Sequence, residues 1–133
     1  MIKYMLDTNI LIYTIKNKPS IVKQTFVQHI GQTCISSVAL MELIYGAEKS
    51  AQAERNLRDI EGLVARLDVL PYADSAAAHS GQIRADLKQK GTPIGPYDVM
   101  IAGHARSEGL ILVSNNLKEF ERVDGLRVEN WIV

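Results

Sequence analysis

Apolar and polar positions along the chain follow two different periods, and the changes between them predict its secondary structure. Short continuous apolar runs, typical of buried strands, alternate with longer segments in which apolar residues return every third or fourth position, as on one face of a helix. The predicted strands cover residues 2–6, 33–36, 69–72, 110–114 and 126–128. The predicted helices cover residues 10–18, 19–30, 37–47, 51–66 and 75–90, a segment that begins at Gly95-Pro96, and residues 117–122.

The order of these elements predicts the fold class. Strands alternate with helices throughout, which favours an α/β protein with a parallel sheet and helices on both faces. The chain has 133 residues and contains no repeat or Pro/Gly/Ser-rich linker. We therefore expect one domain over residues 1–133 with its own core.

Four carboxylates stand where the chain is expected to return to one edge of the sheet. They are Asp7 after the first strand, Glu42 on the helix after the second, Asp98 in the first turn of the Gly95-Pro96 helix, and Glu119 after strand 110–114. Taken singly, each has a local explanation: capping for Asp7, the helix dipole for Asp98, and solvation for the two glutamates. Together they point to the ligand crevice at the carboxyl ends of parallel strands. A hard divalent cation would relieve their repulsion.

Four segments in order resemble the PIN-domain ribonucleases, and most of all the VapC toxins of bacterial VapBC toxin–antitoxin pairs. These segments are Met5-Leu6-Asp7-Thr8-Asn9, Ser36-Ser37 leading to Met41-Glu42-Leu43-Ile44-Tyr45-Gly46-Ala47, Pro96-Tyr97-Asp98-Val99-Met100-Ile101-Ala102, and Leu112-Val113-Ser114-Asn115-Asn116-Leu117-Lys118-Glu119-Phe120. The resemblance extends over the whole chain. It implies a three-layer α/β/α sandwich with a central parallel sheet of about five strands.

The resemblance also implies the chemistry of the site, which is cleavage of RNA with Mg²⁺ or Mn²⁺. Asp7, Glu42 and Asp98 match the three core acids of the family. Many relatives carry an aspartate where this chain has Asn116, so Glu119 is the expected fourth acid. Asp7, Asp98 and Glu119 are expected to bind metal, and Glu42 to bind it directly or through water. Supporting roles fall to Thr8, Asn9, Ser114 and Asn115, of which Ser114 would orient an acid or a water.

Substrate and partners are likewise implied by the resemblance alone. Close VapC relatives cut structured RNA, with the anticodon stem-loop of initiator tRNA as the leading candidate and ribosomal RNA or other tRNAs as alternatives. The family further implies a toxin homodimer, a tight complex with a VapB-type antitoxin, and binding of operator DNA only through that complex. The antitoxin would silence the site with a tail that places a basic residue among the carboxylates.

Composition and charge say more about where the protein is located than about its activity. The formal net charge is zero, whereas nucleic-acid binders are more often basic, so an RNA site would need its cations arranged locally. Cys34 is the single cysteine, which excludes an internal disulfide and makes a reducing cytoplasm the expected location. No stretch is long and apolar enough to span a membrane, and Asp7 interrupts any signal-peptide pattern.

Other functions compete with the metal-dependent nuclease. A metal-free ribonuclease would use histidines and the 2′-hydroxyl and would leave a cyclic phosphate, but His29, His79 and His104 form no obvious pair and are expected to be structural or exposed. A haloacid-dehalogenase-type phosphotransferase needs a second aspartate where Asn9 stands. A receiver domain needs an acidic pair and a late lysine that the chain lacks. A non-catalytic PIN-like module for RNA or a partner stays open.

Overall fold

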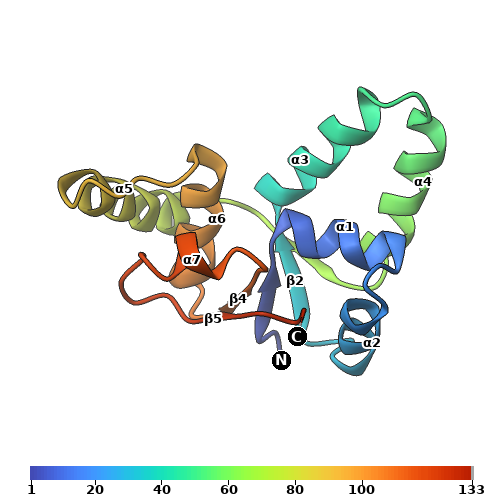
Figure 1. Cartoon of the computed structure of the whole chain (residues 1–133), viewed down its shortest axis with the longest axis horizontal. Coiled ribbons are helices and arrows are strands. Elements are labelled where there is room, and N and C mark those ends of the chain that lie inside the picture. Colours follow the sequence, from blue (N-terminus) through green and yellow to red (C-terminus); the bar gives the residue numbers. More distant parts are fainter. Residues whose placement is uncertain (133) are drawn as a thin grey trace.

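The computed structural model describes residues 1–132, and within them the chain forms five strands and seven helices (Figure 1). The strands are β1 (Tyr4–Leu6), β2 (Thr33–Ser36), β3 (Asp68–Leu70), β4 (Ile111–Val113) and β5 (Val128–Glu129). The helices are α1 (Thr8–Lys16), α2 (Ser20–Gln28), α3 (Ser37–Glu48), α4 (Ala53–Val64), α5 (Asp74–Gln89), α6 (Pro96–Ser107) and α7 (Leu117–Phe120). In this described part, no helix is both long enough and apolar enough to cross a membrane.

All five strands are parallel and form one sheet in the order β3-β2-β1-β4-β5, as the alternation of elements predicts. β1 lies at the centre, with Tyr4 opposite Thr33 on one side and Ile111 on the other. Its three residues are all buried, as expected for a strand covered on both faces. Helices α1 to α4 lie to one side of the strands and α5 to α7 to the other, giving the expected α/β architecture (Figure 1).

The carboxyl edge of this sheet is where the chain passes from strand to helix. Asp7 ends β1 and caps α1, because its carboxylate accepts a 3.0 Å hydrogen bond from the backbone N–H of Ile10. Ser36 ends β2 and caps α3 by accepting from the N–H of Val38 at 3.1 Å. Ser114 follows β4 and is fully buried. Three neighbouring strands therefore deliver small polar groups to one edge.

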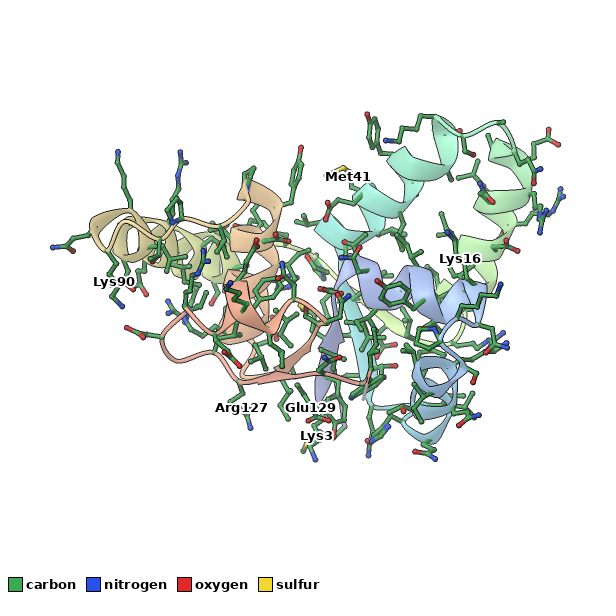
Figure 2. All side chains as sticks on the ribbon, viewed as in Figure 1. Lys3, Lys16, Met41, Lys90, Arg127 and Glu129 are labelled. Carbon is green, nitrogen blue, oxygen red and sulfur yellow. The ribbon has the colours of Figure 1, made fainter. Side chains whose placement is uncertain are left out.

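Several details differ from the sequence-based expectation. The strand predicted over residues 69–72 ends at Leu70, because the N–H of Tyr72 donates to the hydroxyl of Ser37 rather than to a neighbouring strand. Of the apolar positions predicted on helix 37–47, Met41 and Ile44 are exposed. Figure 1 shows why: α3 and α4 extend as a pair beyond the sheet, so only one side of α3 meets the core. Figure 2 shows Met41 on the outer side of that helix.

The contact between α5 and α6 is unusually close at Gly103. A Cβ atom placed on Gly103 would lie 2.7 Å from the backbone nitrogen of Ser80 and would clash with its side chain. The apolar pattern of the sequence, Ala77 and Ala78 included, gave no sign of this contact; both alanines are exposed, and Ala76 and Ser80 face inward instead. Gly103 thus fixes the position of α6, the helix that carries Asp98.

Candidate metal centre and active site

Asp7 is the most buried of the four acids, with 5% of its surface exposed. Burial raises its pKa above the ordinary value, and the nearby charge of Glu42 adds to this effect. Hydrogen bonds from the hydroxyl of Ser114 and from the backbone N–H groups of Ile10 and Asn9 act in the opposite direction. A carboxylate held by three donors at a strand end has a fixed orientation.

Glu42 lies beside Asp7 through a contact between two helices. The hydroxyl of Thr8, in the first turn of α1, donates a 2.9 Å hydrogen bond to Glu42 Oε1 on α3. Glu42 is half-buried, and this bond fixes the position of one of its two carboxylate oxygens.

Asp98 shows that the four acids share one electrostatic environment. Its pKa is raised to about 6, first by burial and then by the negative charges of Glu119, Asp7 and Glu42. These three residues come from α7, from the end of β1 and from α3. The folding pattern therefore brings together all four acids that were predicted from the sequence. Like charges at close range keep a proton on one member unless a cation is present.

The ion pairs of the structure offer no such cation. Within residues 1–132, the ion pairs join Lys90 to Asp86 and Asp124, and neither pair includes Asp7, Glu42, Asp98 or Glu119. Nor do the described His, Cys, Asp and Glu side chains form a group of three that could hold one metal ion directly. Mg²⁺ is commonly bound by one or two carboxylates with water completing its shell, so an oxygen-only, mutually repelling donor set fits a hard divalent ion.

The other predicted supporting residues, Ser114, Asn9 and Asn115, each make a different contact. Ser114 accepts from the N–H of Asn116 at 2.8 Å, which leaves its own proton for the carboxylate of Asp7. Asn9 acts on Asp7 through its backbone N–H. The amide of Asn115 donates to the hydroxyl of Tyr13 at 3.2 Å and so ties the loop after β4 to α1.

Each histidine is engaged by a different neighbour. The ring of His29 stacks on Trp131 with centroids 5.2 Å apart, and His79 Nδ1 accepts a 2.9 Å hydrogen bond from Arg106. His104 is buried, lies 2.8 Å from the hydroxyl of Ser36, and has its pKa lowered by burial. These contacts agree with the structural roles expected for all three. The contact between His104 on α6 and Ser36 at the end of β2 was not predicted from the sequence, because no local spacing relates two residues that are 68 positions apart.

Comparison with known proteins places these features in a family. The PIN domain model matches residues 4–126. The tRNA(fMet)-specific endonucleases VapC of Shigella flexneri and Salmonella typhimurium are 65% and 60% identical to this chain, each over 98% of it and 99% of the relative. Among solved structures, DNA-bound VapBC from Salmonella typhimurium matches with a TM-score of 0.94 at 60% identity, covering 98% of this chain and 99% of that one. VapBC2 from Rickettsia felis, bound to a promoter fragment, matches with a TM-score of 0.91 at 38% identity over 98% of this chain and 99% of that one.

Proposed function

The chain belongs to the PIN-domain family and, within it, to the VapC endoribonuclease toxins of VapBC systems, and we propose that it cleaves initiator tRNA(fMet) with Mg²⁺ or Mn²⁺ at the four acids. The observation that carries the metal is the gathering of carboxylates around Asp98, whose pKa is raised to about 6 first by burial and then by the charges of Glu119, Asp7 and Glu42. The substrate rests on the two relatives at 65% and 60% identity, which are both tRNA(fMet)-specific endonucleases.

In this proposal Asp7, Asp98 and Glu119 hold the metal, one or two of them directly and the rest through bound water, and Glu42 either joins them or acts through water. When bound, the ion would lower the pKa of the attacking water and stabilise the negative charge that develops on the phosphate. Hydrogen bonds from Ser114 and from the first turn of α1 favour the ionised form of Asp7 against the effect of burial and fix the orientation of its carboxylate. Thr8 occupies one oxygen of Glu42 and leaves the other available to orient the attacking water or to take its proton. In-line attack by water leaves a 5′-phosphate and a 3′-hydroxyl.

The partners follow from the same likeness. We expect a complex with a VapB-type antitoxin that binds DNA, which the solved VapBC complexes support. A homodimer, and operator DNA bound only through the antitoxin complex, are implied by the family resemblance. A basic antitoxin side chain would complement the acids because no described cation pairs with them. The expected location is the cytoplasm, where the tRNA substrate is found.

The experiment is cleavage of purified tRNA(fMet) by the toxin freed of its antitoxin, in Mg²⁺, in Mn²⁺ and in EDTA. We expect metal-dependent cutting that is lost in Asp7→Asn and kept in Asp59→Asn, the same substitution on the exposed side of α4. Cleavage by Asp7→Asn, or cleavage in EDTA, contradicts the proposed site. Binding of tRNA without turnover in any metal favours a non-catalytic RNA-binding module instead.

A further inference from the structure

A groove lies between α5, α6 and the segment that leads into α6, the helix that carries Asp98. This groove has a volume of about 650 Å³, within the range of small-molecule sites. Figure 1 shows α5 and α6 running side by side. The floor is largely apolar, and the residues used below are Ile94, Val99 and Met100.

Two cations stand on the rim of the groove, on α5. Arg84 and Lys88 both line it, are exposed, and lie one helical turn apart. Among the described residues neither makes an ion pair, whereas Lys90 at the end of the same helix pairs with Asp86 and Asp124. Like charges four residues apart weaken a helix by a few tenths of a kcal/mol. The helix dipole favours a cation at Lys88, which lies in the last turn of α5, but it does not account for the second charge at Arg84. An anionic ligand between the two side chains would relieve their repulsion.

The groove and the acids share a wall. Pro96, Val99 and Met100 line the groove, and they flank Asp98 on the first turns of α6. The carbonyl of Pro93, also in this wall, accepts a 3.2 Å hydrogen bond from Arg122, which follows the helix of Glu119. A molecule in the groove therefore lies beside the segment that carries Asp98.

We propose that this groove binds an unpaired nucleotide of the RNA substrate, with its base against Ile94 and Met100 and its phosphates at Arg84 and Lys88. The inference rests on the proposed function and names a binding subsite for it. An apolar floor with a cationic rim matches the two halves of a nucleotide, and proteins commonly read RNA through bases turned out of a loop. Because the net charge of the chain is zero, phosphate binding must come from such local pairs.

The test compares Arg84→Ala/Lys88→Ala with Lys23→Ala/Arg55→Ala, which removes the same charge from α2 and α4 on the other side of the sheet (Figure 1). Cleavage of tRNA(fMet) and equilibrium binding of the same tRNA in EDTA are both measured. We expect the groove variant to raise KM and Kd about tenfold and to leave kcat within about twofold. Loss of two contacts to single-stranded phosphates should also reduce the slope of log K against log salt by about 1.4. The control should match the wild type.

A second variant tests the base. Each unpaired loop nucleotide of the tRNA is replaced in turn by an abasic one. At the bound position this replacement should weaken binding to the wild type, and the loss of affinity should be much smaller for Ile94→Ser. Unchanged KM, Kd and salt slope in the groove variant, with wild-type cleavage intact, overturns the subsite and leaves the proposed function standing. Absence of both RNA binding and cleavage in the wild type overturns both. If the groove variant keeps its RNA affinity but loses self-association or the antitoxin complex, the groove is a protein interface and the subsite is wrong.

Discussion

Thr8 Oγ1 donates a 2.9 Å hydrogen bond to Glu42 Oε1, and this bond joins the first turn of α1 to the middle of α3 across the carboxyl edge of the sheet. Asp7 is the neighbour of Thr8 in the chain, so a single turn of backbone positions two of the four acids. The threonine of the Asp-Thr-Asn segment therefore serves the site through its side chain, in addition to any role in beginning the helix.

Replacing Thr8 by valine keeps the shape of the side chain and removes the donor. We expect kcat on tRNA(fMet) to fall about tenfold, corresponding to about 1.4 kcal/mol, with little change in KM, because Glu42 loses its fixed orientation. Thr8→Ser retains the hydroxyl and should restore most of kcat. A Thr8→Val enzyme with the wild-type kcat would show that Glu42 needs no such support.

Replacing Asp98 by asparagine should abolish cleavage and stabilise the metal-free protein at pH 7. The pKa of Asp98 is raised from 3.8 to about 6, so between these values the folded state binds more protons than the unfolded chain. Stability contributed by this group therefore falls as pH rises from about 4 to about 6 and stays reduced above that. After a discount for solvent screening we expect a gain of about 1–2 kcal/mol in urea unfolding with EDTA.

The control for this prediction is Asp59→Asn, which changes an exposed charge on α4. Added Mg²⁺ should raise the melting temperature of the wild type and of the control but have little effect on Asp98→Asn. If Asp98→Asn is less stable than the wild type in EDTA, the electrostatic account of the acid cluster is wrong.

His104 makes the opposite contribution to the pH dependence of stability. Its pKa is lowered by burial, which the charge of Glu108 opposes only in part. As pH falls below about 6.5, the unfolded chain takes up the proton first, so the stability contributed by neutral His104 is lost. In the Asp98→Asn background, urea unfolding between pH 7 and pH 5 should show this loss. The added change His104→Gln should remove that pH dependence while lowering stability throughout, because the contact with Ser36 and the packing on Tyr72 change.

Gly103 is expected to tolerate no side chain. Gly103→Ala forces a methyl group onto Ser80, and we expect a loss of about 1–3 kcal/mol in the free energy of unfolding. Gly62→Ala, in the last turn of α4 with nothing within 4 Å of the added atom, should instead stabilise the protein by about 0.5–1 kcal/mol. Thermal unfolding of the two variants shows whether the loss of stability comes from close packing at Gly103 or follows from any Gly→Ala change in a helix. Equal melting temperatures for the two variants would contradict close packing at Gly103.

Much of this arrangement was predictable from the sequence because it depends on local periodicity. The strand over residues 33–36 and its helix cap follow from a buried run that ends in serine, and Asp7 follows from an apolar run that stops at a carboxylate. The convergence of the four acids was inferred from the rule that parallel strands deliver their carboxyl ends to one edge.

What could not be predicted depends on distances between segments remote in the sequence. The bond between His104 and Ser36, the approach of Gly103 to Ser80 and the groove beside Arg84 arise only when α6 is packed against α5 and β2. The exposure of Met41 was likewise invisible to a hydrophobic pattern, which cannot show that α3 projects beyond the sheet.

The most direct test of the central claim is to digest total tRNA with the antitoxin-free protein in Mg²⁺ and to sequence both ends of the products. The account predicts cuts confined to initiator tRNA, with a 5′-phosphate on one fragment and a 3′-hydroxyl on the other, and no cuts with Asp7→Asn. Fragments that end in a 2′,3′-cyclic phosphate would contradict the carboxylate–metal chemistry. Cuts spread over many tRNAs would contradict the proposed substrate.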